Sequence, residues 1–110
     1  MGLDEYLLPG EEIRFQSPGE IEYGNCRYTL YLTNKRLILY KQSGFFIFKK
    51  DHIVTEKLSD IESLRYREEG FLLKKGVIEV VTKTRKIFLR GDAHSMKALF
   101  QSLQELIGKE

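Results

Sequence analysis

The sequence predicts a small, mainly β domain that ends in one α-helix. Segments in which apolar and polar residues alternate recur between turn residues from residue 12 to residue 90, as in antiparallel sheets. Seven Phe and six Tyr with no Trp also favour a sheet, because aromatic rings pack well on a pleated surface. After residue 91 the apolar period becomes helical. A length of 110 residues fits one hydrophobic core, so residues 1–110 are expected to form a single domain.

The first strand is expected over residues 12–16, where Ile13 and Phe15 share one face. A turn at Pro9-Gly10 precedes it, and Pro18-Gly19 is predicted to end it. An acidic loop over residues 20–25 should follow.

The clearest strand pattern covers residues 26–32. Asn34 tolerates positive φ, so residues 33–35 predict a tight turn into a second strand over residues 36–40. The expected inner face of the first of these two strands carries Cys26, Tyr28, Leu30 and Leu32, and its outer face carries Arg27, Thr29 and Tyr31.

The later strands follow at regular spacing, which gives about seven in all. Gly44, Gly70 and Gly76 are interpreted as isolated turn glycines. One or two strands are expected over residues 45–48 and 52–55, another over 60–66, and a hairpin over 77–81 and 86–90.

A helix of about 15 residues is predicted at the C-terminus, with one apolar stripe that must dock on the sheet. Asp92 suits the N-cap, and Gly108 suits the C′ position at the other end. The stripe consists of Met96, Leu99, Phe100, Leu103, Leu106 and Ile107.

No catalytic, metal or cofactor site can be read from the sequence. Cys26 is the only cysteine, so no intramolecular disulfide can form and a reducing compartment is expected. His52 and His94 lie too far apart for zinc-ligand spacing, and no glycine-rich phosphate loop is present. We therefore expect a binding module and not an enzyme.

The N-terminus carries Asp4 and Glu5 where a signal peptide would carry positive charge. No apolar run approaches the roughly 18 residues that span a bilayer. A cytoplasmic location is the expectation.

Charge is strongly segregated along the chain, although the net charge is only +2. Residues 1–24 carry −5, residues 25–50 carry +6, residues 51–70 carry −3 and residues 71–91 carry +5. Separate acidic and basic zones bear on the choice of partner rather than on the fold.

Four segments together resemble the prokaryotic pleckstrin-homology-like domains, which are related to GRAM domains. The segment Tyr31-Leu32-Thr33-Asn34-Lys35-Arg36-Leu37-Ile38-Leu39 resembles their "LTNxRL" hairpin. Residues 8–13 (Leu-Pro-Gly-Glu-Glu-Ile), 58–64 and 76–80 resemble the markers around it, and they occur in the same order along nearly the whole chain.

The resemblance implies a partly open barrel of two roughly orthogonal antiparallel sheets with seven strands, plugged at one end by the C-terminal helix. It also implies a non-enzymatic scaffold that binds membranes, peptides or proteins, with the loops after strands one, three and six at the open end. Because the chain has no Trp, the prokaryotic and GRAM-like branches fit better than the eukaryotic one.

The sequence is compatible with two functions. The first is protein–protein association, with a peptide or with a second copy, because segregated charge suits complementary binding. The alternative is peripheral binding to anionic lipids at the inner membrane face, through basic loops with exposed Phe. Candidate residues for a lipid or another partner are Lys41, Phe45, Phe46, Lys49, Lys50, Lys83, Arg85 and Lys86.

Lipid binding and nucleic-acid binding each meet an objection. Glu20 and Glu22 occupy the first loop, where they would weaken attraction to anionic lipid. Nucleic-acid binding is disfavoured, although tyrosines and basic residues interleave over residues 27–40, because the chain is only mildly basic.

Overall fold

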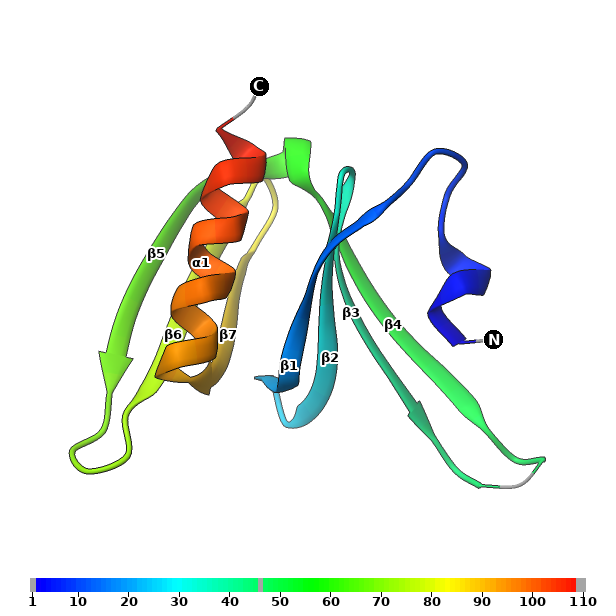
Figure 1. The fold of residues 1–110 in the computed structure, drawn as a ribbon, viewed down its shortest axis with the longest axis horizontal. Coiled ribbons are helices and arrows are strands. Elements are labelled where there is room, and N and C mark those ends of the chain that lie inside the picture. The colour runs from blue at the N-terminus through cyan, green and yellow to red at the C-terminus, as the bar shows by residue number, and fades with distance from the viewer. Residues whose placement is uncertain (1, 46, 109–110) are drawn as a thin grey trace.

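The computed structural model describes residues 2–45 and 47–108. Seven antiparallel strands form one curled sheet of order β4-β3-β2-β1-β7-β6-β5, and the helix packs on its inner side (Figure 1). The predicted mainly β fold with one C-terminal helix is therefore confirmed. In chain order the elements are η1 (Gly2–Tyr6), β1 (Ile13–Tyr23), β2 (Cys26–Thr33), β3 (Arg36–Ser43), β4 (Lys50–Lys57), η2 (Leu58–Asp60), β5 (Ile61–Glu69), β6 (Lys75–Thr82), β7 (Lys86–Asp92) and α1 (Ala93–Ile107).

The sheet has two halves that meet at one point. Strands β1 to β4 pair over long stretches, as do β5 to β7, but β1 and β7 share only the pair Glu22 and Arg90. The outer strands β4 and β5 diverge from the end at which η2 joins them, like the arms of an inverted V in Figure 1. This is the partly open barrel that the resemblance implied.

Strand β1 continues past Pro18-Gly19, so the prediction that it ends there is wrong. The register passes from Gln16 opposite Tyr31 to Glu20 opposite Thr29, which leaves residues 17–19 facing the single residue Leu30. A bulge of this kind accommodates a proline, which has no amide hydrogen to donate. The buried hydroxyl of Ser17 accepts from the amide of Leu30 and donates to the carbonyl of Gly19, so the strand remains paired. Residues 20–23 of the expected acidic loop therefore lie within β1, and residues 24–25 form the turn to β2.

Residues 45–48 do not form the expected strand. Strand β4 begins at Lys50, and the described residues of 45–48 lie in the loop before it. Gly44 turns the chain there with φ +82°, a conformation that L-residues with a side chain rarely adopt.

The core lies between the helix and the sheet. Met96, Leu99 and Leu103 of α1 are fully buried against inward-facing residues of β6, β7 and β1. Asp92 caps the helix as predicted, accepting a hydrogen bond from the amide of Ser95 at 3.0 Å. Gly108 ends the helix in a right-handed conformation with φ −72°, so it does not form the left-handed C′ turn that was expected.

Gly76 is a packing glycine and not a turn glycine. It is buried within β6, where a Cβ atom would lie 2.7 Å from the Cβ of Met96 and 3.0 Å from the ring of Tyr66. The missing side chain lets α1 approach the sheet closely.

The segment before β1 is clamped to the turn between β2 and β3. Glu11 has a fully buried side chain and forms a two-pronged ion pair with Arg36, with nitrogen–oxygen distances of 2.9 and 3.0 Å. The hydroxyl of Thr33 donates to the same carboxylate at 2.6 Å. Asn34 accepts from the amide of Glu12 and donates to the carbonyl of Gly10. Two of the segments that carry the family resemblance thus hold each other in place.

The outer face of β3 is covered by η1. Arg36, Ile38 and Tyr40 alternate onto this face, and η1 contacts both outer members of the series. Ile38 between them is fully buried, and Leu3 is the buried apolar residue of η1. Strand β3 is therefore covered on both faces, which explains why apolar residues occur on both.

Candidate functional site

Two hairpin loops expose large apolar side chains that have no place in the core. We call residues 44–50 the β3–β4 tip and residues 70–75 the β5–β6 tip. The exposed fractions are 69% for Phe45, 88% for Ile47, 75% for Phe48, 88% for Phe71, 87% for Leu72 and 87% for Leu73. Clusters of exposed apolar side chains of this kind are typical of surfaces that contact a partner or a membrane.

The two tips share one local design. Each begins with a glycine at positive φ, Gly44 at +82° and Gly70 at +101°. A Cβ atom on either glycine would collide with the carbonyl oxygen that immediately precedes the first lysine of its loop. Each continues with apolar residues and ends in a pair of lysines, Lys49-Lys50 in one and Lys74-Lys75 in the other. The sequence thus repeats a glycine, an apolar run and two lysines at two places far apart along the chain.

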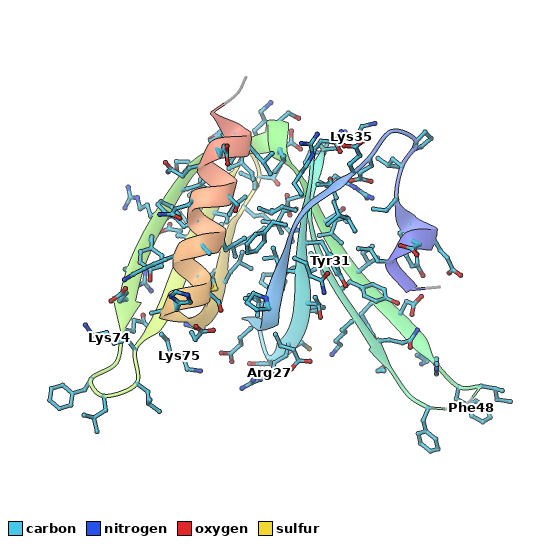
Figure 2. The ribbon with its side chains drawn as sticks, in the orientation of Figure 1. Arg27, Tyr31, Lys35, Phe48, Lys74 and Lys75 are labelled. Atoms are coloured by element: carbon cyan, nitrogen blue, oxygen red, sulfur yellow. The ribbon has the colours of Figure 1, made fainter. Side chains whose placement is uncertain are left out.

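Both tips project from the same end of the molecule. In Figure 1 the longest axis is horizontal and has an extent of 41 Å. The two tips lie far apart along this axis, one on the left and one on the right, and both point downwards. The turn between β1 and β2 lies between them at that end. Figure 2 shows Phe48 at one extreme, Lys74 and Lys75 near the other, and Arg27 between them.

The lysines of the two tips differ in their surroundings. Lys49 and Lys50 make no ion pair within the described residues, whereas Lys74 lies 3.9 Å from Glu68. Asp51 follows the first pair, and hydrogen bonds from Gln42, and then from Tyr6, hold the pKa of its carboxyl below the usual value. An ionised carboxylate thus lies close to the lysines of each tip, Asp51 at the β3–β4 tip and Glu68 at the β5–β6 tip.

Lys41 lies on the inner face of β3 rather than at the tip. It is half-buried, and its ammonium sits 5.5 Å from the centre of the Tyr28 ring. His52 is its cross-strand neighbour and shares a 3.0 Å hydrogen bond with Ser43. Lys41 thus lies in the paired part of the β3–β4 hairpin and not in its loop.

The remaining predicted basic residues lie at the opposite end. Arg85 forms an ion pair with Glu56 near the end of β4, and the amide of Lys83 donates to the carbonyl of Asp60 in η2. Lys86 lies 3.5 Å from Glu79. The eight residues of β4 separate this turn from the β3–β4 tip by about 25 Å, at roughly 3.3 Å per residue.

The structure therefore brings together a different set of loops from the one expected. Loops after β1, β3 and β5 share an end, and the turn after β6 lies at the other end (Figure 1). Phe45, Lys49 and Lys50 lie together at the β3–β4 tip, and Phe46 lies outside the described residues. Sequence reasoning missed Phe71, Leu72, Leu73, Lys74 and Lys75. The repeated pattern of glycine, apolar run and two lysines is the signal that could have revealed them.

The described residues contain no group of three or more His, Cys, Asp or Glu side chains placed to hold a metal ion. None of the described helices has the length and hydrophobicity needed to cross a membrane.

Comparison with known proteins identifies the fold. No family model and no curated protein sequence matches the chain. Among solved structures, the chain is similar to a pleckstrin homology domain from Shewanella amazonensis SB2B, with a TM-score of 0.68 at 15% sequence identity. The match covers 96% of this chain and 91% of that one. We conclude that this chain adopts the pleckstrin-homology-like fold.

Proposed function

We propose that this chain is a non-catalytic module that binds peripherally to anionic membranes, with its two tips inserted at the interface. The observation that carries the proposal is the pair of exposed apolar loops on one end of the molecule, each followed by two lysines. Among the two functions considered from sequence, this arrangement favours lipid binding over protein association.

The apolar residues suit a membrane interface better than water. Transfer of a Phe, Leu or Ile side chain out of water is favourable, by about 1.5–3 kcal/mol on full burial and by less at an interface. Both tips can contact one surface at the same time, because they project from the same end. Two linked contacts hold far more tightly than either would alone.

The lysines add electrostatic attraction. Each Lys near an anionic bilayer surface contributes about 1 kcal/mol, and the contribution falls with salt. In each tip the lysines directly follow the apolar run, so they can reach headgroups while the apolar side chains enter the boundary below them.

Vesicle flotation tests the proposal directly. Wild-type protein should float with vesicles of phosphatidylglycerol and phosphatidylcholine, and less with phosphatidylcholine alone. Ile47→Ser/Phe48→Ser and Leu72→Ser/Leu73→Ser should each weaken binding by about 30-fold, taking about 1 kcal/mol per side chain. These residues are exposed, so the variants should unfold at the wild-type temperature.

Two matched substitutions complete the experiment. Leu8 and Phe88 are also exposed, at 45% and 38%, but neither belongs to a tip. Leu8→Ser and Phe88→Ser should leave flotation unchanged. Equal loss in the tip variants and these controls would contradict insertion of the tips.

Protein association stays a prediction from the sequence, and the same variants examine it. If wild-type protein fails to float but sediments as an oligomer, and the tip variants are monomeric, the tips bind a second copy instead of lipid.

A further inference from the structure

A groove lies beside the β5–β6 tip at the membrane-facing end. Its volume is about 480 Å³, within the range of small-molecule sites. Leu72 and Leu73 of the tip form its apolar side. Strands β1, β2 and β7 contribute the polar side. The lining residues are Gly19, Glu20, Glu22, Arg27, Leu72, Leu73, Lys74, Lys75, Arg90, Gly91 and Asp92.

Three of the charged groups in this groove already have partners. Asp92 caps α1, Lys74 lies 3.9 Å from Glu68, and Arg90 lies 3.9 Å from Glu69.

Two cations and two carboxylates remain. Within residues 2–45 and 47–108, no ion pair of 4.0 Å or less involves Arg27, Lys75, Glu20 or Glu22. Glu20 and Glu22 share one face of β1, and Arg27 is the cross-strand neighbour of Glu22. Two cations and two carboxylates without such an ion pair thus lie around one opening.

The carboxylates are what the proposed function leaves unexplained. Glu20 and Glu22 would be repelled by an anionic surface, yet they lie at the end that we assign to the membrane. A ligand that carries one positive and one negative group would satisfy both kinds of side chain.

We propose that the groove binds the headgroup of phosphatidylethanolamine. Arg27 and Lys75 would donate to its phosphate oxygens, and its primary ammonium, with three N–H donors, would donate to Glu20 and Glu22. Leu72 and Leu73 would flank the glycerol and the first part of the acyl chains. A choline headgroup has no N–H to donate, so the groove discriminates against phosphatidylcholine. The inference deepens the proposed function and rests on it for access to the lipid.

A water-soluble probe tests the groove without any membrane. Amide chemical shifts of the labelled protein are followed during titration with glycerophosphoethanolamine, and with glycerophosphocholine as the control. Shifts confined to residues 19–27, 72–75 and 90–92 with the first compound, and at least tenfold weaker with the second, are expected. Equal shifts with both compounds, or none with either, would contradict binding of the phosphatidylethanolamine headgroup in the groove, whether or not the protein binds vesicles.

Variants extend the test to vesicles. Replacing phosphatidylcholine by phosphatidylethanolamine at constant phosphatidylglycerol should tighten wild-type binding about tenfold, as expected for charge-assisted hydrogen bonds at the interface. Glu20→Gln/Glu22→Gln should abolish this preference and at the same time strengthen binding to phosphatidylglycerol alone.

A matched control variant is Glu62→Gln, which removes an exposed carboxylate at the start of β5, near the opposite end. It should leave the preference intact. If the double variant keeps the wild-type preference, lipid packing and not the groove is its source and the inference is wrong. Failure of all vesicle binding together with a positive titration would contradict the proposed function alone.

Discussion

The carboxylate of Glu11 has no exposed side-chain surface and accepts hydrogen bonds from Arg36, Thr33 and the amide of Leu8. The bonds from Arg36 are the main reason that the pKa of Glu11 is lowered from 4.5 to about 2. A carboxyl with a lower pKa in the folded state stabilises the fold above its unfolded pKa. That contribution is about 3 kcal/mol at neutral pH, and it is lost as the pH falls from about 5 to about 2.

Glu11→Gln should therefore lower the free energy of unfolding by about 3 kcal/mol at pH 7, because it leaves the Arg36 guanidinium half-buried without its counter-ion. At pH 2 the difference from wild type should fall below about 1 kcal/mol, because Glu11 is then half-protonated in the folded state and almost fully protonated in the unfolded state. Urea unfolding at both pH values measures this. The neighbouring Glu12 provides the control, because its side chain is 71% exposed and its pair with Arg14 is a surface contact. A loss in Glu12→Gln as large as in Glu11→Gln would contradict the buried clamp.

At the scale of elements, the helix and the sheet fit because one residue has no side chain. Gly76→Ala would force a Cβ atom to within 2.7 Å of the Cβ of Met96, a side chain that is fully buried and has little room to move. Such overpacking typically costs about 1–3 kcal/mol, and thermal unfolding should show the loss. Gly19→Ala is the matched control, since nothing lies within 4 Å of a Cβ at that position. If both variants lose stability equally, the cause is not the approach of the helix.

Strand alternation and helical periodicity were enough to predict most elements. The residues of β2 follow from local pattern, because buried and more exposed side chains alternate along the strand. The Asp92 cap follows from its place directly before the first residue of the helix. The extension of β1 could not be predicted, because it depends on the Ser17 hydroxyl replacing a backbone partner across the sheet. Local sequence contains the serine but not its distant partner Leu30.

The candidate site was only half predictable for a related reason. The apolar run over residues 45–48 has the composition of a strand, and only the tertiary structure shows that Phe45, Ile47 and Phe48 lie exposed in a loop. The family resemblance groups Lys83 and Lys86 with the tip, because it implies that the loops after strands three and six share the open end. Which loops share an end depends on how the chain crosses from β4 to β5, and composition does not report that.

At the scale of the whole molecule, basic residues occupy both ends, whereas the apolar side chains of the described residues that are more than two-thirds exposed lie in the two tips at one end. Lys49 and Lys50 lie at the β3–β4 tip. Lys83 and Lys86 lie about 25 Å away along β4, at roughly 3.3 Å per residue. A distance of this size exceeds the screening length of about 8 Å at physiological salt, so the far pair feels little of a membrane bound at the tips.

Two double variants remove the same net charge from opposite ends of the molecule. The first is Lys49→Gln/Lys50→Gln and the second is Lys83→Gln/Lys86→Gln. The first should weaken binding to phosphatidylglycerol vesicles about 30-fold at low salt, at about 1 kcal/mol per lysine, and the second by less than threefold. Flotation at low and at physiological salt measures both, and the difference should shrink as salt rises because exposed charges are screened. Equal losses would mean that net charge alone attracts the protein to lipid. A larger loss in the second variant would place the membrane contact at the β6–β7 turn, and the tips would then be free for another partner.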